Sequence, residues 1–147
     1  MKNDTYNNLG IGIVSIGFVI NIMKSISLDK VFLIIPFFTH QELLTYLGKS
    51  NSDIKSIEQI ISNKIGCFSN FNNRYFDTLV LSMNAIQYLI DMEYVELING
   101  NLVLKKAMVF DNKMGARAEK IYKASNNVAK LLNDNSSNLY LNLRVEI

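Results

Sequence analysis

Residues 74–106, RYFDTLVLSMNAIQYLIDMEYVELINGNLVLKK, decide the fold of this chain. Apolar residues recur at steps of three and four through the first part of this stretch, which predicts a helix. Two apolar lines run along that helix: Phe76, Leu79, Val80, Met83, Ile86 and Ile90 form the first, and Leu81, Ala85, Tyr88 and Met92 form the second. Only a narrow polar strip is left for water: Asp77, Asn84, Gln87 and Asp91. We therefore expect most of the helix surface to be buried.

The second part of the stretch predicts a β-hairpin. Two short runs rich in β-forming residues, 94–98 and 101–104, are joined by Asn99-Gly100. This dipeptide accepts the positive φ angles of a type I′ turn. A helix that leads into a hairpin is the core of a winged-helix unit. We predict an α+β fold that is mainly helical and winged-helix-like, with a β-hairpin wing.

Length and composition favour a single domain with a binding partner. The chain has 147 residues, of which 49% are apolar and 19% are charged. This length supports one domain with a substantial core, here residues 1–147, and is too short for two ordinary domains. We expect N-terminal helices in residues 1–65, the central helix and hairpin in 70–104, and a basic helix with a terminal strand in 105–147. The apolar excess suggests a surface that another protein covers.

The residues that carry chemistry are few. Cys67 is the single cysteine and His40 the single histidine, which excludes a disulfide within the chain and a His-rich metal centre. A Cys67 and His40 dyad is conceivable, but no catalytic motif surrounds either residue. The sequence also lacks a phosphate-binding glycine loop and a serine elbow. We expect no enzyme activity, no cofactor and no small-molecule substrate, and a reduced cysteine fits the cytoplasm.

Positive charge is concentrated in the last third of the chain. Residues 1–104 carry seven Lys or Arg against nine Asp or Glu, and residues 105–147 carry eight against four. The basic part can contact nucleic acid or an acidic partner, or it can simply form a solvated face. The candidate residues for such a contact are Lys105, Lys106, Lys113, Arg117, Lys120 and Lys123.

The N-terminal segment is apolar without being a membrane span. Residues 5–23 carry no charge, but asparagines bracket an apolar run shorter than the roughly 20 residues that a bilayer requires. A signal peptide is not expected, because no small-residue cleavage site follows. The stripe of Leu9, Ile13, Ile16, Ile20 and Met23 predicts a buried amphipathic helix. Gly10, Gly12 and Gly17 would let a neighbouring element approach closely.

The remaining elements follow from local patterns. Residues 31–38 form an apolar run that we expect to be buried. Thr39 and Glu42 have the spacing of a capping box at the start of a helix that Gly48 ends. We expect a further helix over 54–65, a turn-rich segment over 66–73 and a helix over about 114–132. Residues 139–147 alternate between apolar and polar, which predicts a strand that either closes a sheet or pairs with another chain.

The segment LIIPFFTH, residues 33–40, resembles the "LVLPLVLH" segment of the middle components of three-component ABC systems. Phe71 and Arg74 stand ahead of a long helix as in that family, and residues 83–90 resemble its "treALxYL" helix. Residues 118–121 resemble its Ala-rich basic helix, and 139–145 its "iyxlLGV" ending. Residues 142–144, Asn-Leu-Arg, replace the usual Leu-Gly pair.

The resemblance implies a non-catalytic subunit that bridges an SMC-like or Rad50-like ABC ATPase and an effector, in bacterial defence against phage and plasmids of the Lamassu type. DNA could be contacted within such a complex. The alternative is a winged-helix DNA-binding regulator. The apolar faces either dock on a partner or enclose the central helix within the domain. The candidate interface residues are Leu33, Pro36, Phe38, His40, Leu81, Tyr88 and Met92. Among them, Pro36 and His40 match the family and are assigned to the shape of the interface.

Overall fold

The computed structural model describes residues 2–49 and 54–147, and side chains from residue 8 onward. In the described residues of the first half, helices predominate and one short strand is present. Its elements are α1 (Lys2–Met23), β1 (Ser25–Ser27), α2 (Leu28–Val31), α3 (Ile34–Phe38), α4 (Gln41–Leu47), α5 (Ile57–Asn63) and α6 (Ile65–Phe68). The predicted loop after Gly48 falls partly on residues 50–53, outside the described residues.

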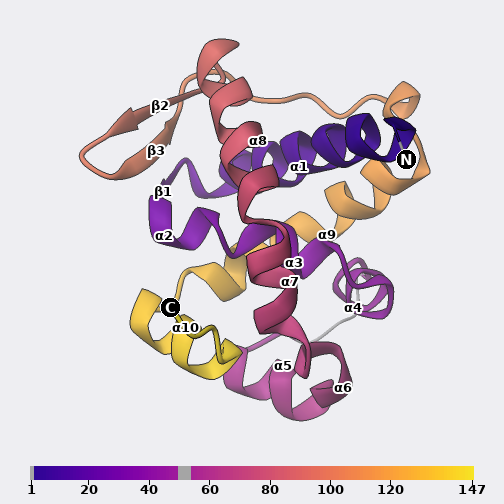
Figure 1. Cartoon of the computed structure of the whole chain (residues 1–147), viewed down its shortest axis with the longest axis vertical. Coiled ribbons are helices and arrows are strands. Elements are labelled where there is room, and N and C mark those ends of the chain that lie inside the picture. The colour runs from indigo at the N-terminus through magenta and orange to yellow at the C-terminus, as the bar shows by residue number, and fades with distance from the viewer. Residues whose placement is uncertain (1, 50–53) are drawn as a thin grey trace.

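The second half holds the hairpin and the basic helix. Its elements are α7 (Phe71–Asp77), α8 (Leu79–Asp91), β2 (Val95–Ile98), β3 (Asn101–Leu104), the 3-10 helix η1 (Asn112–Met114), α9 (Ala116–Leu132) and α10 (Ser136–Leu143). In Figure 1, α8 crosses α1, and the hairpin extends from one end of the molecule. Helix α1 packs against both α8 and α9, so it is the centre of the fold. The mainly helical α+β prediction is confirmed.

The central helix is interrupted where a continuous helix was predicted. Helix α7 ends at Asp77 and α8 begins at Leu79, with Thr78 between them at φ −102° and ψ 2°. The Thr78 hydroxyl donates a hydrogen bond of 2.8 Å to the Arg74 carbonyl oxygen, which closes the end of α7. A threonine hydroxyl that bonds back to a carbonyl four residues earlier bends or weakens a helix. The break at Thr78 therefore divides the predicted central helix into α7 and α8.

The hairpin prediction is confirmed, and a third strand joins it. Asn99 and Gly100 both have positive φ angles, 51° and 79°, as a type I′ turn requires. β2 pairs with β3 from Val95↔Leu104 to Ile98↔Asn101. β1 pairs with the other edge of β3, so the strand order is β1-β3-β2. β1 and β2 are therefore the two edge strands, and β2 is the one that immediately follows α8.

The predicted terminal strand is a helix. Asn135 caps the start of α10, because its side-chain oxygen accepts hydrogen bonds from the backbone amides of Ser137 and Asn138. Leu139 and Leu143 are buried one helical turn apart, whereas Leu141 is exposed. Leucine at every second position satisfies a strand pattern, but here a spacing of four selects the two residues that reach the core.

Two local predictions near α4 and α6 also need correction. The helix cap is His40 and not Thr39: His40 Nδ1 accepts a hydrogen bond of 3.2 Å from the Leu43 amide. The Thr39 hydroxyl instead donates to the Pro36 carbonyl oxygen. The segment 66–73, predicted to be turns, holds most of α6 and the start of α7. The predicted ends of α4 at Gly48 and of α9 at Leu132 are confirmed.

The buried side chains form one cluster that extends from α1 to Val145. Ile16 and Ile20 face it from α1, which confirms the predicted buried helix. Two glycines of α1 allow the expected close approaches. A Cβ added at Gly12 would lie 3.2 Å from Ile35 Cδ1, and one at Gly17 would lie 2.7 Å from Met108 Sδ. Among the described residues, no helix combines the length and apolar character needed to cross a bilayer.

Candidate functional site

Three of the predicted interface residues belong to the core. Leu33 and Phe38 have no exposed surface, and Pro36 is buried as well. They lie in or beside α3, which contacts α1, α4, α7 and α9. A helix of five apolar residues surrounded in this way has no face left for a partner. The assignment of Leu33, Pro36 and Phe38 to a protein interface is therefore wrong.

Pro36 and His40 instead hold the corner between α3 and α4. The Pro36 carbonyl oxygen accepts a hydrogen bond of 3.2 Å from Arg74 Nε, which ties α3 to α7. His40 is half-buried and caps α4 through its Nδ1. These contacts place both residues in the architecture of the corner.

The other predicted interface residues lie on α8 and divide between its two sides. Leu81 is partly buried, and its Cγ lies 3.3 Å from the position that a Cβ at Gly12 would take. Tyr88 and Met92 are exposed, at the end of α8 that leads into the hairpin. Only these last two remain candidates for contact with another protein.

An exposed apolar ridge on the outer side of α7 and α8 was not predicted. It consists of Phe76, Val80 and Met83, with exposed fractions of 43%, 64% and 51%. We call these three residues the outer ridge. They were assigned to the buried line of the helix, but the buried residues of α8 are Ser82, Ala85, Ile86 and Leu89. The prediction that the central helix is buried over most of its surface is wrong.

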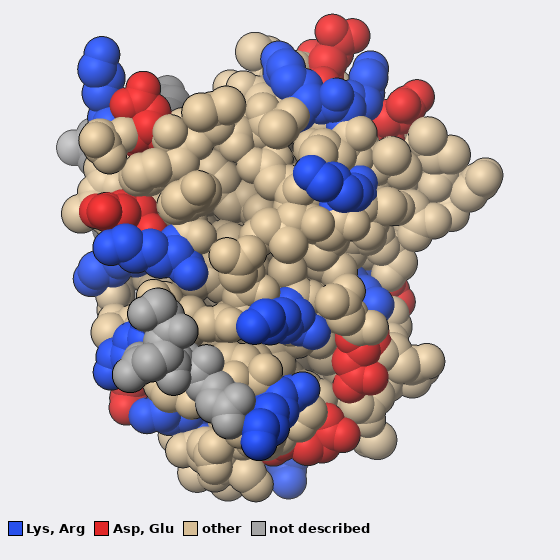
Figure 2. Space-filling model, turned by 180° about the vertical axis from the view of Figure 1, so that it is seen from behind, with Lys and Arg blue, Asp and Glu red and all other residues tan. Residues whose placement is uncertain are grey.

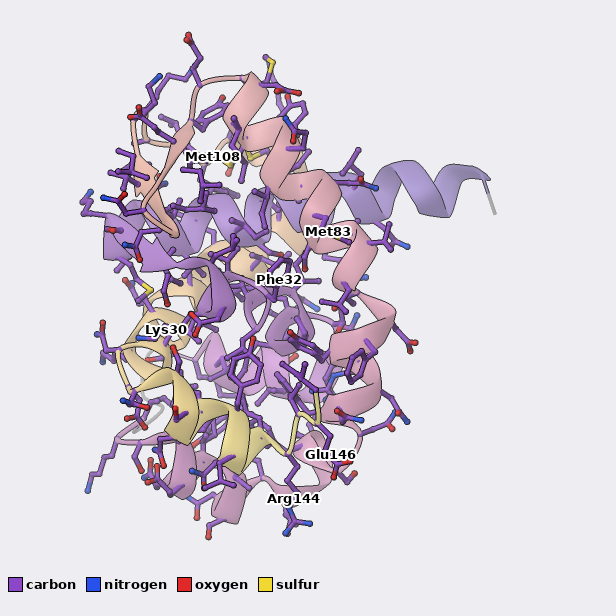
Figure 3. All side chains as sticks on the ribbon, turned by 60° about the vertical axis from the view of Figure 1, so that its left-hand side comes forward. Lys30, Phe32, Met83, Met108, Arg144 and Glu146 are labelled. Atoms are coloured by element: carbon purple, nitrogen blue, oxygen red, sulfur yellow. The ribbon has the colours of Figure 1, made fainter. Side chains whose placement is uncertain are left out.

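The sequence did carry a signal for the outer ridge. Val80 stands three residues after Asp77 and four residues before Asn84, so it shares a helical face with both. All three are exposed. An apolar residue in the middle of a polar strip faces solvent or a partner. This holds even when the residue also lies three or four positions from other apolar residues. Met83 can be followed on α8 in Figure 3.

The six basic candidates do not form one continuous positive surface. Lys105 lies 3.9 Å from a Glu93 carboxylate oxygen, and the Lys106 ammonium sits 4.4 Å above the Tyr94 ring. Lys123 lies 3.6 Å from Glu119 on α9. Lys113, Arg117 and Lys120 are exposed at or near the start of α9. On the face shown in Figure 2, the Lys and Arg side chains are scattered, with Asp and Glu among them.

Arg117 lies between two shallow hollows beside α1. One, of about 550 Å³, is lined by the start of α9 and by Asn8, Ile11 and Val14. The other, of about 330 Å³, also borders Asp77 and Asn84 of the α7–α8 segment. The acidic Asp77 weakens the attraction of a phosphate group to this side of Arg117, because like charges repel.

A hollow of about 630 Å³ lies between α2, α7 and α10. Phe32, which Figure 3 labels, is one of the residues that line it. The Tyr140 hydroxyl donates to the Asp29 carbonyl oxygen and lies 3.3 Å from the Tyr75 hydroxyl. Burial raises the pKa of Tyr140, and its hydrogen bond with Tyr75 adds to this rise. At this hollow, the Tyr140 hydroxyl is thus bonded both to the Asp29 carbonyl oxygen and to the Tyr75 hydroxyl. Leu28, Phe32 and Val145 supply an apolar lining.

Burial raises the pKa of Asp29, but hydrogen bonds from Ser27 and Ser136 outweigh it, and the pKa of this carboxyl is lowered overall. Asp29 therefore stays ionised at neutral pH on the rim of the hollow. The polar side chains that line the hollow are the Asp29 carboxylate and the hydroxyls of Tyr75, Ser136, Ser137 and Tyr140. Such an arrangement can orient a bound group by hydrogen bonds.

Cys67 is not set up as a nucleophile. Its side chain is 2% exposed, and burial, together with the nearby Glu42 carboxylate, raises the pKa of the thiol. A raised pKa leaves less of the reactive thiolate at neutral pH. The His40 Nδ1 accepts the hydrogen bond that caps α4. Within residues 2–49 and 54–147, no cluster of three His, Cys, Asp or Glu side chains could hold a metal ion.

Residues 20–147 match the model of a protein family described as ABC-three component (ABC-3C) system Middle Component 3. The match begins near the end of α1 and includes every later element. No curated protein and no solved structure matches the chain.

Proposed function

The chain belongs to the Middle Component 3 family of ABC-three component systems, and we propose that it acts there as a non-catalytic bridge between two larger components. One is an ABC ATPase of the SMC or Rad50 kind, and the other is an effector. The setting we propose is the cytoplasm of a bacterium, in a Lamassu-type defence against phage or plasmids. The membership makes the chain one part of a multi-component system.

The outer ridge is the observation that carries this proposal. Phe76 near the end of α7, and Val80 and Met83 on α8, are three large apolar side chains that are all exposed. Exposed apolar residues are ordinary when single, whereas a group on one face marks a contact site. Polar residues at Asn84 and Gln87 border the ridge. This is the pattern of a protein interface with an apolar centre and a polar rim.

The surroundings of Cys67 and His40 are consistent with a role through contact. The buried Cys67 thiol and the capping His40 have structural surroundings. A bridging subunit needs two faces that bind different partners, and no chemistry of its own. The outer ridge supplies one face. The hairpin side, with Tyr88 and Met92, supplies a second.

A winged-helix DNA-binding regulator is the second candidate. It is favoured by the element order, in which α1, β1, several helices, α8 and the hairpin follow one another and β1 pairs with β3. In such proteins the helix before the wing enters the major groove. Helix α8 contains no Lys or Arg, and Asp91 lies exposed at its end. Since phosphates repel carboxylates, this helix suits a protein surface better than a duplex.

Co-expression with the other two components tests the bridge. We expect the three chains to elute together in size-exclusion chromatography with light scattering. The double variant Val80→Lys/Met83→Lys should lose one component, because two buried ammonium groups at an interface are costly. The matched control is Val109→Lys/Leu141→Lys, which changes two residues outside α7 and α8 that are 77% and 76% exposed.

Two results would contradict the bridge. One is a free chain that never elutes with either component. The other is a chain that binds duplex DNA tightly by itself, with an affinity that falls steeply between 50 and 200 mM salt as phosphate contacts require. The second result would establish the regulator. If the ridge variant and its control retain both components equally, the interface does not include Val80 and Met83 of α8.

A further inference from the structure

The outer edge of the wing sheet is open. The strand order is β1-β3-β2, so β3 is paired on both sides and β2 on one side only. A two-residue turn makes Ile98 and Asn101 a hydrogen-bonded pair, and in an antiparallel ladder such pairs alternate. Glu96 therefore bonds to β3, while Val95 and Leu97 direct their N–H and C=O groups to the outer edge. In the described part of the chain, no hydrogen bond from another element reaches the Leu97 backbone.

The hydrogen bonds between β3 and the β1 side of the sheet support this alternation of bonding directions. The Leu104 amide donates to the Lys24 carbonyl oxygen at 2.8 Å, and the Gly100 carbonyl accepts from the Leu28 amide at 2.9 Å. Even-numbered residues of β3 thus bond toward β1, as the register requires, and odd-numbered ones bond toward β2. The outward direction of Leu97 on β2 follows from the same register.

On the sheet face that carries Leu97, the side chains along this edge are apolar. Leu97 is 50% exposed, although it lies on the same sheet face as Val95, which is 1% exposed. Tyr88 and Met92, at the end of α8, are also exposed beside the entry to β2. Natural edge strands are usually guarded by charged side chains, above all Lys, by Pro or by a bulge, and in β2 the only such residue is Glu96 on the opposite face. β2 has the sequence VELI and contains no Lys or Pro.

The charges near the edge specify what can pair with it. Asp91, Glu93 and Glu96 are all exposed on or just before β2. Of these, Glu93 has Lys105 at 3.9 Å, and both side chains are largely exposed. A strand that carries Lys or Arg would meet these carboxylates, whereas an acidic strand would be repelled.

A second copy of this chain is a poor occupant. Pairing two β2 edges antiparallel requires Val95 and Leu97 of one copy to meet the same odd-numbered residues of the other. The register with two hydrogen-bonded pairs, Val95 with Leu97 and Leu97 with Val95, places Glu96 directly opposite Glu96. Like charges in that position destabilise a sheet. The edge therefore favours a chain of different sequence.

We propose that β2 receives a fourth strand: an extended segment of another component of the same system, in which basic residues alternate with apolar ones. The backbone of Leu97 pairs with this strand, the apolar residues of the strand cover Leu97 and Met92, and its Lys or Arg side chains meet Glu93 and Glu96. This is strand addition, in which backbone hydrogen bonds supply affinity and alternate side chains supply specificity. The inference rests on the proposed function, because it takes the strand from a partner component.

Hydrogen exchange at single amides tests the pairing directly. The reconstituted complex of all three components is placed in D2O and quenched, and the amides are then measured in the dissociated chain. In the free chain we expect the Leu97 amide to exchange fast while Glu96 and Ile98 are slow. In the complex, Leu97 should slow by at least about tenfold, since it gains a ladder hydrogen bond. An amide at Leu97 that stays fast in an intact complex would overturn the proposal.

Substitutions separate the contribution of backbone hydrogen bonds to binding from the contribution of the charged side chains. Leu97→Pro removes the outward N–H, and proline is tolerated at this position of an edge strand. It should weaken binding of the strand donor by about tenfold or more, whereas Leu97→Thr keeps the N–H and should weaken it less. Glu93→Lys/Glu96→Lys should weaken binding at 50 mM salt more than at 500 mM salt, because salt screens the repulsion. Circular dichroism checks that each variant is folded.

The outcomes distinguish this inference from the proposed function. If no complex forms with the unmodified chain, the bridging function itself fails. If the complex forms and Leu97→Pro binds as well as Leu97→Thr, strand addition alone is refuted. If the free chain is a dimer whose Leu97 amide is already slow, the occupant is a second copy and the proposal is overturned.

Discussion

Helices α3 and α8 are both built from apolar residues at helical spacing, yet their surroundings differ. α3 is enclosed by α1, α4, α7 and α9, and all five of its residues are buried. α8 packs against α1 and the sheet on one side, and its outer side reaches solvent. The same kind of sequence therefore serves the core in one place and a surface in the other. The number of elements around a helix, rather than its own hydrophobicity, decides which role it takes.

The largest expected effect on stability comes from a comparison of two phenylalanines, one in the core and one at the surface. Phe38 in α3 has no exposed surface, and Phe76 at the outer ridge is 43% exposed. Phe38→Ala should lower the free energy of unfolding by about 3–5 kcal/mol, because it leaves a cavity in a packed core. Phe76→Ala should cost about 1 kcal/mol or less, since it loses mainly an edge contact with the Tyr75 ring. Urea denaturation followed by circular dichroism measures both, and similar losses would mean that Phe76 is covered in solution.

A second prediction concerns the point where both helices meet α1. A Cβ at Gly12 would lie 3.2 Å from Ile35 Cδ1 and 3.3 Å from Leu81 Cγ, so it touches α3 and α8 together. Gly12→Leu should destabilise the chain by about 1–3 kcal/mol through overpacking. Gly10 provides the control, because a Cβ there meets nothing within 4 Å. Gly10→Ala should stabilise by about 0.5–1 kcal/mol through helix propensity. A neutral Gly12→Leu in thermal denaturation would show that α8 can move away from α1.

Sequence patterns located the elements that are determined locally. Asn99-Gly100 identified the hairpin because only a few residues accept positive φ at both turn positions. The N-terminal helix and α9 followed from their apolar stripes. The burial of residues 31–38 was predicted almost completely, with Phe32 half-buried. In each of these cases the signal lies within one segment, and distant residues do not alter it.

The errors arose where distant contacts decide the outcome. Residues 139–143 alternate like a strand, but α10 packs against α5, and only Leu139 and Leu143 find a place in the core. β1 has three residues, too few to produce a pattern, and exists because β3 offers it a partner. The outer ridge was taken for core because its spacing is helical. Which of two apolar lines faces inward depends on where α1 lies, and local periodicity contains no information about that.

A third prediction examines the corner beside α3. His40 Nδ1 accepts from the Leu43 amide, whereas the capping-box pattern had assigned this role to Thr39. His40→Ala should cost about 1 kcal/mol, the usual value for a lost helix cap. Thr39→Ala removes only a 3.2 Å hydrogen bond to the Pro36 carbonyl at a half-buried position, so it should cost less. Guanidinium denaturation of the two variants at one pH distinguishes them. A larger loss for Thr39→Ala would return the cap to the residue that the sequence pattern indicated.

The smallest effect on stability is the most informative about function. Val80 and Met83 are 64% and 51% exposed, so Val80→Ala and Met83→Ala should each change the free energy of unfolding by no more than about 0.5 kcal/mol. If the outer ridge is a contact site, the same two changes should weaken binding of a partner component by more than they weaken the fold, because truncation of a residue at the centre of an interface commonly costs about 1–2 kcal/mol. Titration calorimetry with each purified component measures this difference. Loss of stability without loss of binding would make α8 a core helix like α3, and the contrast between the two helices would disappear. Loss of binding at unchanged stability would establish that α8 carries two apolar faces, one that packs on α1 and one that remains for a partner.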